Sequence, residues 1–279
     1  MSETEPSFDS PAVAPAVEPA SPLPVDDMTA PPPSASPTKL GERLISIDAL
    51  RGFDMFWIMG ADKLARTLCE WYATPESIRL ADQFEHVEWE GFHFYDLIFP
   101  LFIFVVGAVI PFSLSKYRVG AHPGASIFLR IIRRVAFLFI LGLLYNNLLQ
   151  FPPLDQLRVM GVLQRIAICY GAAAILYLAM GTRARAILFV LLLLGYWGLF
   201  ALIPSPISHQ KGDYSREANL AGWVDMNYLP GKPYTRFGDN EGLLSTIPAI
   251  ATALLGVFAG EWLRSARSGW AKVGGLLLA

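Results

Sequence analysis

Charged residues are scarce in this sequence: they make up 16% of its 279 residues, whereas soluble domains carry about 25%. Two cysteines are too few for a disulfide framework or a cysteine-based metal site. The net charge of −2, without a basic patch interleaved with aromatic residues, predicts no nucleic-acid partner. Hydrophobic residues reach 53%. These shortages exclude a disulfide-rich secreted domain and indicate that much of the chain lies in lipid rather than in water.

Basic residues are absent from the first 38 positions, which hold ten prolines and six acidic residues. Such a segment cannot bury a core, so residues 1–38 are predicted to form a disordered cytoplasmic tail. The lack of a basic stretch followed by an apolar one excludes a signal peptide, and Met28 is an alternative start. Residues 39–279 are expected to form one membrane domain.

Uninterrupted apolar runs are abundant in the remainder. No charged residue occurs in 97–114, 186–204 or 243–260, and about 20 helical residues cross a hydrocarbon core of ~30 Å. The pattern predicts an all-α, polytopic membrane bundle with six spans, at about 44–64, 92–115, 131–149, 159–180, 186–204 and 243–262. A seventh span begins near Trp270 and stops within an apolar run, so we expect a chain truncated at its C-terminus.

Lysine and arginine are unevenly divided between the two sides of such a bundle. With the N-terminus in the cytoplasm, the inner segments carry twelve of them, and the longer outer segments 62–91, 150–158 and 205–242 carry eight. Basic residues concentrate on the cytoplasmic side of membrane proteins. The bias therefore predicts an integral membrane protein with a cytoplasmic N-terminus. The outer segment 205–242 exceeds the usual length of a connection, which is typical of functional loops.

Three of the charges in the first predicted span lie in its first half. Asp48, Arg51 and Asp54 are spaced three apart, which puts them on one helix face. They form either a self-neutralised ladder that fixes helix packing, or an arginine oriented by carboxylates toward an anionic ligand.

Arg165 lies about seven residues inside the fourth predicted span and should face the bundle interior. It leaves a similar choice between contact with a ligand and a structural ion pair. The carboxylates considered for that pair are Asp62, Asp96 and Glu241.

Titratable groups crowd the start of the second span, where an acidic loop turns apolar. His86 stands among three glutamates and shares a face with His93 if that piece is helical. A histidine there can act as a general base, a nucleophile or a ligand, or only as an interfacial side chain. Metal or haem would need a partner at matching depth, and His122 and His209 lie in loops on opposite sides. We therefore predict neither. Two prolines, Pro100 and Pro111, are expected to kink this span.

Four sequence blocks, in order, resemble the heparan-α-glucosaminide N-acetyltransferase family and its bacterial relatives. The first is RL at 43–44 with SIDALRGF at 46–53, and the second is His86, Trp89, Gly91 and Asp96 with FPLFIFVVG at 99–107. The third is GVLQRI at 161–166, and the fourth is DNEGLLSTI at 239–247 with LG at 255–256. The resemblance covers about 40–279, and four ordered blocks are more specific than any one motif.

The resemblance implies a transferase of the bacterial inner or plasma membrane that acetylates an amino sugar on the far side, using cytoplasmic acetyl-CoA. The family's active-site histidine matches His86, and its asparagine at the outer end of the first span aligns with Asp62. Its Asp-Arg pair in the long outer loop meets Asp225 and Met226, so an arginine contact is expected to be missing. Lysosomal members carry a lumenal domain and further spans, so a chain ending at 279 is expected to be inactive alone.

The predicted topology distributes the candidate residues over two faces. Four arginines at the cytoplasmic face would bind CoA phosphates through their guanidinium groups: Arg51, Arg130, Arg133 and Arg134. Catalytic His86 lies toward the outside, together with an acceptor-side set of Asp62, Asp96, Arg165, Asp225 and Glu241. Asp96 and the glutamates near His86 are expected to orient the imidazole.

Several alternatives stay open. His86 either attacks the thioester and carries the acetyl group, or removes a proton from the acceptor while all components are bound. The acceptor carbohydrate is unidentified, and a homodimer is an open alternative. The rival functions are a polytopic transporter, for which the chain shows no internal repeat, and a non-enzymatic membrane protein of the cell envelope.

Overall fold

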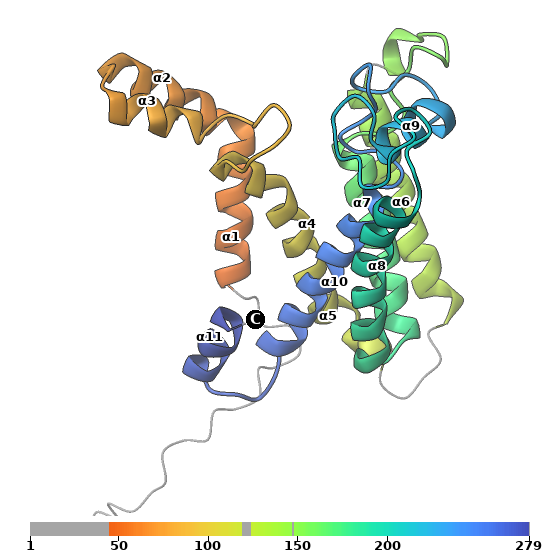
Figure 1. Cartoon of the computed structure of the whole chain (residues 1–279). Helices are drawn as coiled ribbons and strands as arrows, with labels where there is room; N and C mark the ends of the chain where they lie inside the picture. The colour runs from red at the N-terminus through yellow and green to blue at the C-terminus, as the bar shows by residue number, and fades with distance from the viewer. Residues whose placement is uncertain (1–44, 119–123, 147, 279) are drawn as a thin grey trace, which may run out of the picture. The chain divides into compact units, whose positions relative to one another are not determined.

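The computed structural model describes residues 45–118, 124–146 and 148–278. Within these ranges the chain forms helices and loops, and its β-type pairing is limited to two isolated bridges, Arg158 with Gly231 and Thr235 with Gly238 (Figure 1). The predicted all-helical class is confirmed. The predicted disordered tail, 1–38, and the alternative start at Met28 lie outside the described residues.

Four helical stretches are long and apolar enough to cross a membrane. The first, Phe94–Tyr117, consists of η2 (Phe94–Leu97), α4 (Ile98–Ala108), α5 (Ile110–Leu114) and η3 (Ser115–Tyr117). The others are α7 (Val162–Ala179), α8 (Thr182–Leu202) and α10 (Thr246–Leu263). They coincide with four of the six predicted spans.

The other two predicted spans are not among these four. The first is helical from α1 (Ile45–Phe56) through η1 (Trp57–Ala61) into α2 (Asp62–Tyr72), with a kink at Gly60, whose φ is 119°. The third is α6 (Ala125–Tyr145), which begins before residue 131 and includes three arginines in its first half. The count of six spans is therefore not confirmed and stays a prediction. A short helix, α11 (Gly269–Leu277), occupies the place of the predicted seventh.

Of the two prolines in the second span, Pro111 coincides with a break and Pro100 does not. The helix is interrupted at Val109, between α4 and α5, because proline at 111 has no N–H to donate to the carbonyl of Gly107. Pro100 lies in the first turn of α4, where backbone N–H groups have no helical acceptor in any case. The helix is thus interrupted near Pro111, where a kink was predicted, and α4 accommodates Pro100 without a break.

The helix α10 packs against α4, α7 and α8 (Figure 1). At its crossing with α4, small residues let the backbones touch. A Cβ added at Gly107 would lie 2.0 Å from the carbonyl oxygen of Ala253, and one at Gly256 would lie 2.0 Å from that of Phe104. Such crossings are typical of membrane helices. This packing fixes the N-terminal ends of α7 and α10 and the start of the 94–117 stretch relative to one another, and these ends carry the candidate site.

Two loops complete that site. Residues 83–93 form a loop between α3 (Pro75–Asp82) and η2, and Gly91 has a φ of 125°, which favours glycine. The condition for a shared helical face of His86 and His93 is therefore not met. The outer loop between α8 and α10 contains α9 (Leu220–Tyr228), whose N-terminus is capped by the Asn219 side chain.

Candidate active site

His86 is held by one carboxylate where the apolar stretch begins. Its Nδ1 lies 2.6 Å from Oδ1 of Asp96, and Oδ2 of Asp96 accepts the backbone N–H of His93 at 2.9 Å. Because a carboxylate only accepts, Nδ1 is the protonated nitrogen and Nε2 of the neutral ring is left as an acceptor. The His86 side chain is 64% exposed. The imidazole therefore presents a free nitrogen in a fixed orientation, with Asp96 in the predicted orienting position.

Tyr95 connects this pair to Asp62. Its ring lies 4.7 Å from the His86 ring, centre to centre, and its hydroxyl lies beside the Asp62 carboxylate. Asp62 begins α2 directly after the kink at Gly60. Three predicted site residues, Asp62 from the end of the first predicted span and His86 and Asp96 from the second block, thus gather around Tyr95.

The glutamates near His86 are used differently from the prediction. Glu85 forms an ion pair with Arg66 at 3.0 Å, so its carboxylate does not orient the imidazole. Glu88 and Glu90 line a cavity described below. Only Asp96, ten residues further along the chain, performs the predicted orientation.

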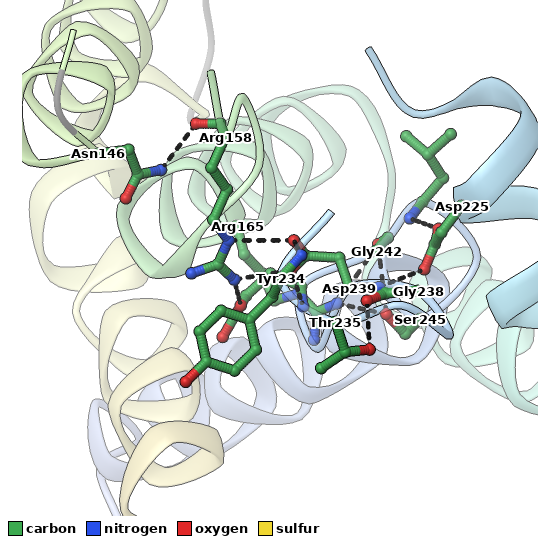
Figure 2. Close-up of polar contacts among 12 residues, drawn as sticks. Asn146, Arg158, Arg165, Asp225, Tyr234, Thr235, Gly238, Asp239, Gly242 and Ser245 are labelled. Carbon is green, nitrogen blue, oxygen red and sulfur yellow. Dashed lines mark hydrogen bonds and ion pairs between the residues drawn. The ribbon is translucent and has the colours of Figure 1, made fainter. Parts of the chain in front are cut away.

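A second polar cluster joins the loop before α7 to the loop before α10 (Figure 2). Arg158 donates from Nε and Nη2 to the two oxygens of Asp239, at 3.0 and 2.7 Å, and from Nη2 to Glu241 at 2.5 Å. The guanidinium also lies over the Tyr234 ring, 4.6 Å from its centre. The Asp239 side chain is 0% exposed. Paired arginine–carboxylate bonds of this kind are among the strongest in proteins.

Asp225, one of the predicted acceptor-side residues, is wrapped by backbone. Its carboxylate accepts the N–H of Leu243 at 2.8 Å and that of Asp239 at 3.3 Å (Figure 2). A Cβ at Gly242 would lie 1.9 Å from an Asp225 oxygen, so only glycine fits there. Backbone N–H groups, rather than an arginine, hold this carboxylate in place.

Burial and charge pairing set the pKa values in this cluster. Burial alone would raise the pKa of Asp239, but the hydrogen bonds and charge of Arg158 outweigh it and hold that pKa below its usual range. Burial raises the pKa of Glu241, and the nearby arginine charges oppose this only in part. Burial also raises the pKa of Asp225 despite its backbone hydrogen bonds. The same ion pairs raise the pKa of Arg158 against the effect of its burial.

Arg165 is buried in α7 and points to the same cluster (Figure 2). It donates to the carbonyl oxygen of Gly242 at 3.3 Å and to the hydroxyl of Ser245. Within the described ranges it forms no ion pair, so the considered pairing with Asp62, Asp96 or Glu241 is not met. Glu241 is instead taken by Arg158, a residue whose position in a short outer loop gave no signal in the sequence.

A cavity of about 620 Å³ lies between the His86 loop, the C-terminal end of α8 and the loop around α9. The two loops are tied together because Trp89 donates its indole N–H to the carbonyl oxygen of Tyr214 at 2.8 Å. The lining combines aromatic rings with carboxylates, among them Trp89, Tyr196, Phe200, Tyr214, Glu88, Glu90, Asp225 and Asp239. His86 is two residues from Glu88 in the chain. The cavity therefore offers flat apolar faces and hydrogen-bond acceptors beside the His86 loop.

The four arginines predicted to bind CoA phosphates do not converge. Arg51 is exposed and pairs with Asp48 at 3.7 Å, while Arg130 donates to the Tyr117 hydroxyl and Arg134 lies over the Tyr170 ring. None of the four lines this cavity, or a second cavity at the opposite ends of α7, α8 and α10. Their phosphate-binding role stays a prediction.

The predicted ladder Asp48–Arg51–Asp54 is only half present. Asp54 is 0% exposed, and neither of its carboxylate oxygens has a hydrogen-bond partner among the described residues. It faces the packed side of α1, whereas Arg51 points outward. No group of three or more histidine, cysteine, aspartate or glutamate side chains that could hold a metal is found in the described parts of the chain.

Comparisons with known proteins agree with the resemblance seen in the sequence blocks. Residues 43–148 match a family described as a domain of unknown function, DUF5009. The human heparan-alpha-glucosaminide N-acetyltransferase is 28% identical over 279 aligned positions, which cover 80% of this chain and 39% of the human protein. The mouse protein of the same name is 31% identical over 96 positions, covering 33% of this chain and 15% of its own length. The chain thus spans well under half of the relatives that it matches.

Proposed function

We propose that this chain forms part of a membrane acetyltransferase that moves an acetyl group from acetyl-CoA to an amine or hydroxyl group of a carbohydrate. The N-terminus is cytoplasmic in this proposal, and His86 faces the outside of a bacterial inner or plasma membrane. The similarity to acetyltransferases and the apolar helices support the transferase and membrane parts. The acceptor, the direction of transfer and the orientation are our inference.

The observation that carries the proposal is the His86–Asp96 pair. Asp96 fixes one ring nitrogen at 2.6 Å and leaves the other exposed, which is the geometry that a general base or a nucleophile needs. The Tyr95 ring packs against the same imidazole, and the Tyr95 hydroxyl is hydrogen-bonded to Asp62. A histidine with only a packing role would not need an oriented and open Nε2.

Two routes of transfer are compatible with this geometry. In the first, Nε2 attacks the thioester carbonyl, CoA leaves as the thiolate, and the acetylimidazole passes its acetyl group to the acceptor. In the second, Nε2 takes a proton from the acceptor as the acceptor attacks the thioester directly, and the departing CoA sulfur is protonated. Asp96 stabilises the imidazolium in the second route and holds the ring for attack in the first.

The cavity beside the His86 loop is the proposed acceptor site. Its aromatic side chains supply apolar faces for a sugar ring, and its carboxylates accept hydrogen bonds from hydroxyl or ammonium groups. Asp225 and Asp239 are in this lining, while Arg165 reaches it through Ser245. The acidic character of the lining favours an acceptor that carries an amine.

The test is His86→Asn in the full-length protein, with acetyl transfer from acetyl-CoA to glucosamine as the measured reaction. Asparagine is polar but cannot act as a base, so we expect a loss of about 10²–10⁴-fold in rate. The unfolding midpoint and the affinity for acetyl-CoA should not change, because the side chain is exposed. A retained rate in a folded His86→Asn protein contradicts the proposal.

His209→Asn is the matched control. His209 is also an exposed histidine of an outer loop, and asparagine tolerates its positive φ of 59°. It lines neither cavity, so its replacement should leave the rate unchanged. Radiolabelled acetate that stays on the wild-type protein and is absent from His86→Asn would support the acetylimidazole route.

A further inference from the structure

A second cavity, of about 640 Å³, lies where four membrane helices end on the face opposite to His86. Its lining comes from the end of the 94–117 stretch, the end of α7, the start of α8 and the end of α10. It shares no lining residue with the proposed acceptor cavity. Four arginine side chains lie in or directly behind it: Arg118, Arg185, Arg264 and Arg267.

The carboxylate of Glu261 accepts hydrogen bonds from three side chains in the wall of this cavity or directly behind it. Its Oε1 accepts Arg118 Nη1 at 2.8 Å and Arg185 Nη2 at 2.6 Å, while its Oε2 accepts the Thr182 hydroxyl at 3.3 Å. The Tyr177 ring lies under both guanidinium groups, 5.0 Å from that of Arg118 and 4.8 Å from that of Arg185. Glu261 is therefore fully used in holding two positive charges together.

Positive charge at this cavity exceeds what Glu261 can neutralise. Arg185 is 0% exposed, and its Nε and Nη1 have no hydrogen-bond partner among the described residues. Arg264 and Arg267 lie over the rings of Phe112 and Trp262, at 5.8 and 4.4 Å, and neither forms an ion pair within the described ranges. The cavity and the residues directly behind it thus hold four guanidinium groups and one carboxylate, which leaves a strong positive field in a partly enclosed space.

The turn that carries Arg264 and Arg267 is held in place before any ligand binds. Trp262 donates its indole N–H to the carbonyl oxygen of Lys272 at 3.1 Å, and Gly275 of α11 packs so closely on the indole that a Cβ there would lie 2.3 Å from it. Arg267 stacks on the same indole. The wall of the cavity that Arg264 and Arg267 form is therefore preorganised, and little side-chain freedom is lost when a ligand is bound.

We propose that this cavity is a binding site for a phosphate group. A phosphate ester carries one to two negative charges and matches the forked donors of arginine, which a single carboxylate cannot satisfy here. The chemistry is shared by the 3′-phosphate and diphosphate of a CoA nucleotide and by the headgroup of an anionic phospholipid at the membrane surface. The nucleotide source rests on the proposed function, and the lipid source does not.

The experiment uses the full-length protein in nanodiscs and the double variant Arg264→Gln/Arg267→Gln. These two side chains lie outside the Glu261 network, so the variant keeps the buried ion pairs and should fold. The control is Arg183→Gln, which removes an exposed arginine at the start of α8 that does not line the cavity. The probes are CoA, dephospho-CoA and adenosine 3′,5′-bisphosphate in phosphatidylcholine discs, and phosphatidylglycerol supplied as the disc lipid.

A nucleotide source predicts that wild-type protein binds CoA more tightly than dephospho-CoA, and that the double variant loses this preference. Its affinity for adenosine 3′,5′-bisphosphate should fall at least about tenfold, as expected for lost charge-assisted hydrogen bonds. A lipid source predicts that phosphatidylglycerol raises the unfolding midpoint of the wild type and of Arg183→Gln, and not that of the double variant.

If the double variant matches Arg183→Gln with every probe, the phosphate site is refuted. That failure would leave the proposed function intact, because the His86→Asn test measures transfer and does not depend on these arginines. A different outcome is that the wild type shows no acetyl transfer, while phosphatidylglycerol raises the unfolding midpoint of the wild type and not that of the double variant. That outcome would confirm the phosphate site and exclude the nucleotide as its ligand.

Discussion

The His86 loop and the Arg158 cluster lie at the same ends of the helices but are built in opposite ways. His86 depends on one carboxylate and is 64% exposed. Asp239 is fully buried as a side chain and receives two bonds from Arg158 and the backbone N–H groups of Tyr234 and Glu241. The first arrangement leaves a reactive nitrogen free, and the second leaves no acceptor of Asp239 idle.

This difference distinguishes a group that is free to react from a cluster that stabilises the fold. Buried charges persist only when they are paired and hydrogen-bonded, and removal of one partner is strongly destabilising. A base or nucleophile must keep a lone pair accessible to the substrate. By this criterion we propose His86 as the reacting group and the Arg158 cluster as the structure that shapes the cavity beside the His86 loop.

The largest expected effect follows from replacing Asp239 by asparagine. The change leaves Arg158 facing an amide in a buried site, so we expect a loss of about 3–5 kcal/mol of unfolding free energy. Thermal unfolding in detergent or recovery of folded protein measures it. Asp213→Asn is the control: Asp213 lies in the same loop between α8 and α10 and accepts hydrogen bonds from Ser215, but it forms no ion pair with an arginine of the described residues. Equal stability of the two variants would contradict an architectural role of the cluster.

A smaller effect, on rate rather than stability, is expected for Asp96→Asn. Asp96 uses both oxygens as acceptors, one for His86 and one for the His93 N–H, and asparagine offers only one. The amide NH₂ facing His86 would shift the ring proton to Nε2, which then cannot accept. We expect about a 10²-fold lower rate with a nearly unchanged unfolding midpoint. Asp96→Glu should recover part of the rate, and equal rates for both variants would argue against a positioning role.

The sequence predicts most of the helices and the pairing of His86 with Asp96, because both depend on local features. Apolar runs identify α7, α8 and α10 within a few residues, and the block containing His86 and Asp96 leads to a pair that does meet in space. The first and third spans were less predictable. Gly60 kinks the first span without interrupting its hydrophobic pattern, and α6 begins at Ala125, before the predicted start of the third span at 131.

Contacts between distant residues could not be predicted. Arg158 has no recognisable pattern around it, yet it joins Asp239 and Glu241 across about 80 residues of chain. Tyr95 is one aromatic residue among many, and its place between His86 and Asp62 depends on the kink at Gly60. The four arginines predicted to bind CoA share only a predicted side of the membrane, and that does not determine whether their side chains converge.

The two carboxylates bound by Arg158 should respond to pH in opposite directions. The raised pKa of Glu241 means that its contribution to stability is present below its unfolded pKa and is lost as pH rises through the folded value. The lowered pKa of Asp239 gives a contribution that is present above its unfolded pKa and is lost as pH falls. The unfolding free energy of Glu241→Gln should therefore increase relative to that of the wild type as pH rises from 4 to 8. This increase should be smaller than the loss of unfolding free energy expected for Asp239→Asn. Thermal unfolding across this range measures the difference, and a relative loss with rising pH would contradict it.

The smallest effect is expected for His93→Asn, which tests whether His86 alone is the reacting histidine. His93 uses its backbone N–H to hold Asp96, and every residue except proline can supply that bond. Its ring nitrogen Nδ1 lies 2.8 Å from the carbonyl oxygen of Glu85, and the asparagine amide can donate to the same oxygen. The rate of acetyl transfer should therefore fall by no more than about threefold, well short of the loss that general-base removal produces. A loss of rate as large as that of His86→Asn, with an unchanged unfolding midpoint, would mean that the two imidazoles act together. The open reacting group would then comprise both histidines rather than His86 alone.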